Sequence, residues 1–83
     1  MEILVGKVKH FYGHIPAIVV ELNEDLKIGD RISIRKKNGE ERFNQTVESM
    51  EIERKKVQEA KAGEEVAILV VGKAKTGDLV YKI

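Results

Sequence analysis

Residues 26–36 read Leu-Lys-Ile-Gly-Asp-Arg-Ile-Ser-Ile-Arg-Lys, and this stretch contains both signals that recur along the chain. A glycine followed by an acidic residue favours a turn, because glycine adopts positive φ without steric cost and the acid accepts turn hydrogen bonds. After that turn, isoleucine alternates with arginine and serine, which is the two-residue period of a strand with one buried face. The stretch therefore predicts a tight turn that leads into a β-strand from Arg31 to Lys36.

The same glycine–acid step recurs along the chain, and each copy precedes a run rich in Ile, Val or Leu. The copies are Gly29-Asp30, Gly39-Glu40, Gly63-Glu64 and Gly77-Asp78. Turn signals repeated between apolar runs are typical of a protein built from several strands. Besides Arg31–Lys36, the predicted strands are Ile3–Lys9, Ile15–Leu22, Glu41–Glu53, Val66–Val71 and Leu79–Ile83. Asn38-Gly39 is a strong hairpin signal between two of them.

One segment, Val47–Ala62, resists this interpretation because it is full of helix formers. On a helix, Val47, Met50 and Val57 would share one face with two charged residues, whereas Ile52 would fall outside that face. Propensity alone predicts a helix here.

Length and composition limit the classes of protein that the chain can belong to. With 83 residues it fits one domain, over residues 1–83, and its core is thin. The net charge of +1 argues against a binder that holds nucleic acid through a general basic excess, although a local patch remains open. The absence of cysteine excludes disulfides and thiolate metal sites. The apolar runs are far shorter than the ~20 residues of a membrane span, and no signal peptide is visible at the N-terminus. We therefore expect a cytoplasmic protein.

Several short motifs, in order, resemble domain II of translation elongation factors. They are Gly6-Lys7-Val8, then Leu26–Ile32, then Thr46–Ile52, then Ala60–Ala67, and finally Gly77–Val80. The matches extend over nearly the whole chain.

This resemblance implies an all-β fold, a small closed Greek-key barrel of about six strands. It also implies a strand, not a helix, at Thr46–Ile52 and a short connector at Val57–Ala62. A similar barrel is appended to the collagenase-like peptidase family, some members of which resemble RNA-modification proteins. In elongation factors the barrel helps to hold the aminoacyl end of tRNA. The GTPase half is missing, since no G-x-x-x-x-G-K-[ST] motif is present, and we expect no nucleotide hydrolysis.

The first candidate binding site is the tip of the hairpin that begins near His10. Phe11 and Tyr12 are candidates to stack on unpaired bases, while His10 and His14 are candidates to contact phosphates. The alternative is a simple turn with one aromatic side chain packed over the end of the barrel. A zinc site is not expected, because two histidines without cysteine or a nearby carboxylate underfill a tetrahedral site.

Two basic clusters are candidate phosphate contacts. The first consists of Arg31, Arg35, Lys36, Lys37 and Arg42, and the second of Arg54, Lys55 and Lys56. Binding through them would weaken steeply with salt. The alternative is a solvated surface that nearby glutamates neutralise.

No catalytic constellation emerges, because Ser33 and Ser49 lack a nucleophile motif such as G-x-S-x-G. The sequence therefore predicts a non-catalytic, cofactor-free binding module, associated with translation or RNA, whose partner is tRNA or rRNA. The alternative is a protein-interaction subunit that docks onto an RNA-modifying or peptidase-like enzyme.

Overall fold

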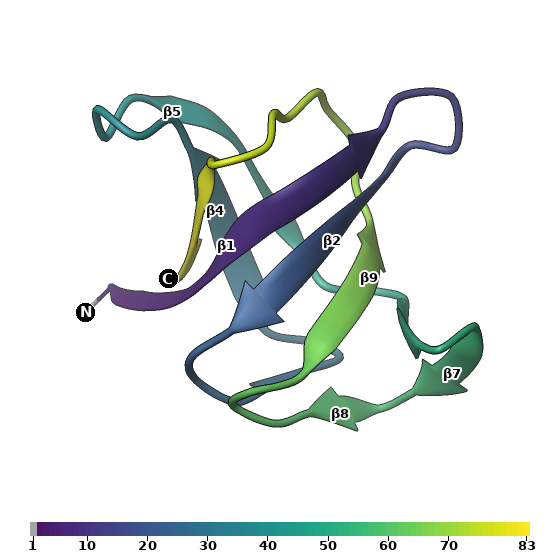
Figure 1. Cartoon of the computed structure of the whole chain (residues 1–83). Coiled ribbons are helices and arrows are strands. Elements are labelled where there is room, and N and C mark those ends of the chain that lie inside the picture. The colour runs from purple at the N-terminus through teal and green to yellow at the C-terminus, as the bar shows by residue number, and fades with distance from the viewer. Residues whose placement is uncertain (1) are drawn as a thin grey trace.

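The computed structural model describes residues 2–83, and all its regular elements are β-strands (Figure 1). The all-β prediction is therefore confirmed. The strands are β1 (Ile3–Tyr12), β2 (Ala17–Leu22), β3 (Leu26–Lys27), β4 (Arg31–Arg35), β5 (Glu41–Thr46), β6 (Met50–Ile52), β7 (Lys55–Val57), β8 (Glu59–Ala60), β9 (Glu65–Leu69) and β10 (Leu79–Lys82). No helix in this part of the chain is long and apolar enough to cross a membrane.

The strands form two antiparallel sheets. The larger sheet contains eight strands in the order β5-β4-β10-β1-β2-β9-β6-β7, and β3 pairs with β8 in the smaller one. The register of β1 shifts twice, between Leu4 and Gly6 against β10 and between Val8 and His10 against β2. Such irregularities increase the local twist of a strand, which helps the sheet to curl around one core. Gly6 is required at the first shift, because a Cβ there would lie 2.6 Å from the carbonyl oxygen of Glu21.

The predicted closed barrel is not confirmed, because neither sheet closes on itself, and β5 and β7 are the edges of the larger sheet. The side chain of Gln45 on β5 nevertheless reaches the chain after β9. Its amide nitrogen donates to the carbonyl oxygen of Leu69 at 2.9 Å, and its amide oxygen accepts from the N–H of Val71 at 2.8 Å. Phe43 packs beside the same segment, since a Cβ on Gly72 would lie 2.7 Å from its ring. A side-chain amide therefore bridges the seam that a backbone ladder would occupy in a closed barrel.

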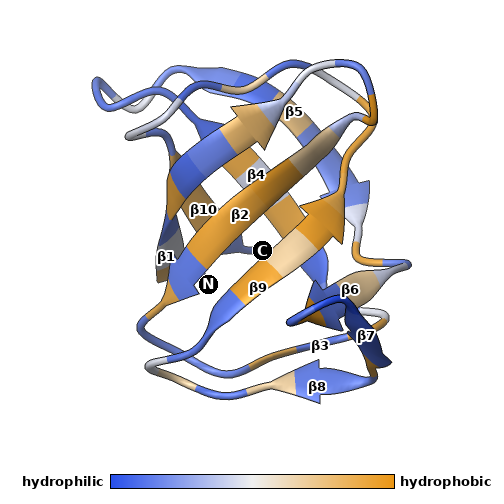
Figure 2. Ribbon diagram, turned by 45° about the vertical axis from the view of Figure 1, so that its right-hand side comes forward, coloured by the Kyte–Doolittle hydropathy of each residue, from blue (hydrophilic) through white to orange (hydrophobic). Residues whose placement is uncertain are grey.

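The core lies inside the curled sheet and is formed by alternate residues of its strands. The side chains with no more than 2% exposure include Val5, Val8, Ile18, Val20, Leu22, Ile32, Ile34, Met50, Val66, Ile68 and Val80. Figure 2 shows this pattern as mostly apolar ribbon along β2 and β9, in contrast to the hydrophilic β7. The alternation that predicted β4 is therefore the pattern that builds the core.

Three of the glycine–acid turns share one hydrogen-bond design. In Lys27–Asp30, Lys61–Glu64 and Lys75–Asp78, the lysine carbonyl accepts from the N–H of the acid at 3.0–3.1 Å. The carboxylate of the acid in turn accepts from the lysine N–H at 2.7–3.0 Å. The glycines have φ of 94–96°, as the third position of a type II turn requires. The predicted turns are thus confirmed.

The helix that propensity predicts over Val47–Ala62 is wrong. This segment contains β6, β7 and β8, and β6 pairs with β9 so that Met50 lies opposite Ile68. Burial of Met50 in the core outweighs a helix propensity that differs between residues by only fractions of a kcal/mol. The strand that the resemblance implied is present at Met50–Ile52, although residues 47–49 are not in a strand.

Candidate functional site

The structure divides the predicted aromatic tip into a half-buried and an exposed part. Phe11 is half-buried and packs against the core, as the alternative to base stacking requires. Tyr12 is 42% exposed and lies on the outer face, with its ring in edge contact with that of His10 at a centroid distance of 4.3 Å. His14 is exposed in the turn that joins β1 to β2. One aromatic side chain, Tyr12, therefore remains as a candidate contact.

The first basic cluster is largely engaged within the protein. Arg35 makes two hydrogen bonds to the carboxylate of Glu2, at 2.7 and 2.8 Å, and its guanidinium lies 4.5 Å from the centroid of the Tyr81 ring. The hydrogen bonds from Arg35 lower the pKa of Glu2, and the same contact raises the pKa of Arg35. Arg35 is thus neutralised by a residue 33 positions away in the sequence.

The other members of this cluster divide into paired and unpaired side chains. Arg42 forms an ion pair of 2.6 Å with the buried Asp78, and Lys36 pairs with Glu40 at 3.2 Å. Arg31 and Lys37 have no carboxylate partner among residues 2–83, and both are exposed. The structure therefore does not assemble the cluster into one basic face.

The second basic cluster occupies the hairpin between β6 and β7. Its turn, Glu53-Arg54, has two residues with φ of 50° and 66°, the left-handed region that other hairpins fill with Asn-Gly. Non-glycine residues held there are strained, and such strain is concentrated at functional sites. Arg54, Lys55 and Lys56 are exposed, and within the described chain none of them pairs with a carboxylate.

Arg54 lies at the rim of a depression of about 400 Å³ on the outer face of the larger sheet, which we call the β2–β9 hollow. Small side chains that face outward, Ala17 of β2 and Ala67 of β9, form the floor of this hollow. In the pairing of the two strands, Ala17 lies opposite Leu69 and Val19 lies opposite Ala67, so these four residues share the outer face. The hollow is lined by Tyr12, Ile15, Ala17, Ser49, Glu51, Arg54, Ala67, Ile68 and Leu69. It combines an exposed aromatic ring, an apolar floor, the unpaired guanidinium of Arg54 and the carboxylate of Glu51.

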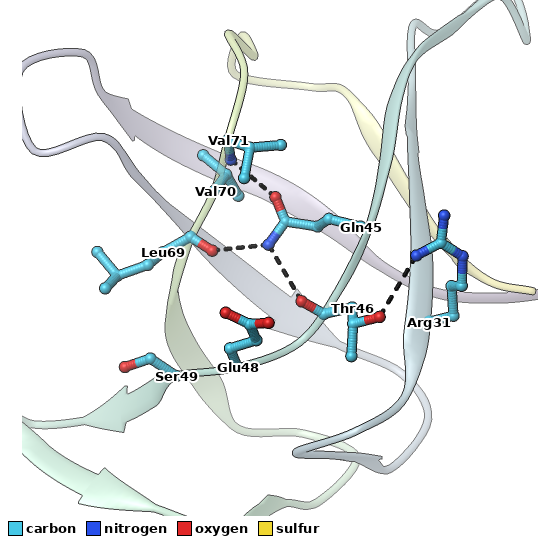
Figure 3. Close-up of a pocket in the computed structure, with 8 residues that line it drawn as sticks. All are labelled: Arg31, Gln45, Thr46, Glu48, Ser49, Leu69, Val70 and Val71. Atoms are coloured by element: carbon cyan, nitrogen blue, oxygen red, sulfur yellow. Dashed lines mark hydrogen bonds between the residues drawn. The ribbon is translucent and has the colours of Figure 1, made fainter.

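A second depression, of about 530 Å³, lies over the gap between β5 and the end of β9, and we call it the seam pocket (Figure 3). It is lined by Arg31, Gln45, Thr46, Glu48, Ser49, Leu69, Val70 and Val71. The amide of Gln45 spans the pocket, and Arg31 donates to the hydroxyl oxygen of Thr46 at 3.3 Å. Leu69 and Ser49 line both depressions, so the two are neighbours.

Sequence reasoning found two residues of the hollow, Tyr12 and Arg54, and missed the others. In the sequence Leu69 follows a run of apolar residues, Val66 to Ile68, which gave no sign of its 49% exposure. Side chains of β9 alternate between the core and the outer face, and Leu69 falls on the outer face. The alternation is hard to see in the sequence because Ala67, which also faces outward, is apolar. Among residues 2–83 no group of three His, Asp or Glu side chains is arranged to hold a metal ion.

The fold and the two depressions define the class of protein as a small all-β domain of the binding type. No family model matches the chain. An uncharacterized protease of Methanocaldococcus jannaschii is 39% identical over 80 residues, which cover 96% of this chain and 19% of the protease. The chain therefore spans about a fifth of the length of this curated relative.

Two solved structures share this fold. The C-terminal domain of a putative U32 peptidase from Geobacillus thermoleovorans superposes with a TM-score of 0.86 at 17% identity, over 95% of this chain and 98% of that chain. Translation elongation factor SelB from Methanococcus maripaludis superposes with a TM-score of 0.65 at 19% identity, over 98% of this chain and 18% of that chain. At these identities the likeness establishes the fold, and it confirms the predicted resemblance to both kinds of domain.

Proposed function

We propose that the chain is a non-catalytic module that binds single-stranded RNA in the β2–β9 hollow. The observation that carries this proposal is the position of Arg54, an unpaired guanidinium held by a strained turn at the rim of an apolar depression. An arginine without a carboxylate partner is free to donate to a phosphate. Its apolar surroundings suit the face of a base.

The aromatic component of the site is Tyr12. Its ring is 42% exposed and borders the floor formed by Ala17 and Ala67, so a base that stacks on the ring also covers apolar surface. Stacking on an aromatic side chain contributes roughly 1–3 kcal/mol per base and requires an unpaired base. The site therefore favours single strands over duplexes.

The charge distribution also supports an RNA ligand. Arg54, Lys55 and Lys56 are consecutive cations at one edge of the larger sheet, within a chain whose net charge is only +1. Lys55 and Lys56 face opposite sides of β7, and Lys56 lies opposite Glu51 of β6. Phosphate binding by such a group releases counterions and falls with salt. We propose tRNA or rRNA as the source of the strand, which would place the protein in the cytoplasm and associate it with translation.

A second candidate function is docking onto a larger enzyme, and one observation favours it. The chain matches only 19% of the Methanocaldococcus jannaschii protease, so that relative has further segments against which such a module could pack. A protein partner would depend on the apolar Leu69 at the centre of the two depressions. It would be much less sensitive than RNA to the charge of Arg54.

Fluorescence anisotropy with a labelled single-stranded RNA hexamer, UGUGUG, tests the RNA proposal. We expect Arg54→Ala to weaken binding about fivefold or more and to reduce the slope of log affinity against log salt by about one. Tyr12→Ala should weaken binding by about fivefold to a hundredfold.

Lys7→Ala is the matched control for this experiment. Lys7 is an exposed lysine without a carboxylate partner among residues 2–83, and it lines neither depression. It removes one positive charge and should leave affinity nearly unchanged. The proposal is wrong if the protein fails to bind the hexamer at low salt, or if Lys7→Ala weakens binding as much as Arg54→Ala does.

A further inference from the structure

We propose that the seam pocket is a second nucleotide subsite, so that the protein holds two consecutive nucleotides of one strand. This inference rests on the proposed RNA function and specifies where the strand continues. The strand passes from the β2–β9 hollow over Leu69 and into the seam pocket, where Arg31 contacts phosphate and Glu48 reads the base.

The continuity of the two depressions is the first step. Leu69 and Ser49 line both of them, and Leu69 is 49% exposed at their common border. Val71 is 77% exposed on the seam side. A base that leaves the hollow therefore finds a second apolar surface directly beside the first, which a strand with stacked or splayed bases can cover.

Arg31 supplies the second step, a phosphate contact. Its guanidinium donates to the hydroxyl oxygen of Thr46 at 3.3 Å and has no carboxylate partner among residues 2–83. The hydrogen bond to Thr46 fixes the direction of the side chain and leaves its other N–H groups free. A pre-oriented guanidinium of this kind suits a phosphate.

Glu48 supplies the third step, a choice between bases. Its carboxylate lies in the pocket between Thr46 and Leu69, and it forms no ion pair within the described chain (Figure 3). A carboxylate accepts hydrogen bonds only, so it selects a base that presents N–H donors. Guanine offers two adjacent donors on its Watson–Crick edge, and single-stranded RNA is read on that edge.

Gln45 completes the pocket without contacting the ligand. Both polar atoms of its side-chain amide are already used, one by the carbonyl oxygen of Leu69 and the other by the N–H of Val71. Its part is therefore to position the backbone of residues 69–71. The charged groups left for a ligand are those of Arg31 and Glu48.

The test compares two labelled single-stranded RNAs, UGUGUG and UAUAUA, by anisotropy. We expect the wild type to prefer UGUGUG by about fivefold or more, as a good base contact gives. Glu48→Gln should remove most of this preference, because its amide presents both a donor and an acceptor. Arg31→Ala should weaken both RNAs about equally and lower the salt slope by about one, whereas Lys7→Ala should change neither quantity.

The outcomes separate the subsite from the function on which it rests. If the wild type binds neither RNA, the RNA function and the subsite are both wrong. A different outcome is that Arg54→Ala weakens binding but Arg31→Ala and Glu48→Gln leave affinity and base preference unchanged. In that case RNA binding in the β2–β9 hollow is supported and the second subsite is wrong. Arg31 and Glu48 are both exposed, so neither variant should unfold the protein, and circular dichroism melting checks this.

Discussion

The carboxylate of Asp30 accepts a hydrogen bond from the backbone N–H of Lys27 at 3.0 Å and another from its ammonium group at 3.2 Å. Burial would raise the pKa of Asp30, but these hydrogen bonds and the nearby Lys82 outweigh burial, and the pKa lies below its ordinary value. A lowered pKa means that the folded state favours the charged form. The stability contributed by Asp30 is therefore complete above the ordinary value and is lost as pH falls through the lower, folded value.

We predict that Asp30→Asn lowers the free energy of unfolding at pH 7 by about 1 kcal/mol, because charge-assisted hydrogen bonds become neutral ones. Urea denaturation at a series of pH values measures this. The difference from wild type should begin to shrink as the pH falls below about 4, the ordinary value for Asp, and should disappear once the pH is below the lowered pKa of the folded state. Glu24→Gln is the control, since Glu24 is exposed and has no ion pair in the described chain. A pH-independent difference would contradict the assignment.

Single residues also mark the limit of sequence reasoning about the site. Arg35 and Arg42 carry the same sequence signal as Arg54, but Glu2 and Asp78 neutralise them from 33 and 36 positions away. No local pattern reveals partners at that separation, because they meet only after the sheet has folded. Arg54, in contrast, forms no ion pair among residues 2–83.

At the scale of secondary structure, strands with clean alternation were predicted well and short strands were not. The predicted strand from Arg31 to Lys36 differs from β4 by one residue, since its isoleucines face the core without exception. The hairpin of β6 and β7 was missed because its turn, Glu53-Arg54, lacks the glycine or asparagine that usually indicates positive φ in a hairpin turn. Residue propensities do not predict a strained turn of this kind, and this turn contains Arg54, the arginine of the candidate site.

The seam between β5 and β9 gives a prediction at this scale. Gln45→Leu removes both hydrogen bonds of the side-chain amide and leaves the carbonyl of Leu69 and the N–H of Val71 without their partner. We expect the free energy of unfolding to fall by about 1–3 kcal/mol. Hydrogen exchange at the Val71 amide should accelerate about tenfold or more.

Gln58→Leu is the matched control for the seam, because Gln58 is exposed and its side chain makes no hydrogen bond within the described residues. If Gln45→Leu leaves exchange at Val71 at the wild-type rate, the amide does not hold the seam. Stability loss without faster exchange would indicate a defect elsewhere in β5.

At the scale of the whole molecule, the sequence predicted the all-β class and its resemblance to translation-factor and peptidase domains, and both are confirmed. It did not predict how the sheet ends meet. A closed backbone ladder was expected, whereas Gln45 bridges the gap with its side chain. That gap is also what creates the seam pocket, so the departure from the expected barrel lies next to the proposed binding surface.

The measurement that tests the binding surface most directly is an NMR titration of the ¹⁵N-labelled chain with single-stranded UGUGUG RNA. We expect the largest shifts at the amides of Tyr12, Ser49, Arg54 and Leu69, which surround the β2–β9 hollow and its border with the seam pocket. The turn between β4 and β5, which contains Lys36 and Lys37 of the other basic cluster, should change little. Shifts confined to that turn, or no shifts at low salt, would contradict the assignment of the hollow as the RNA-binding site.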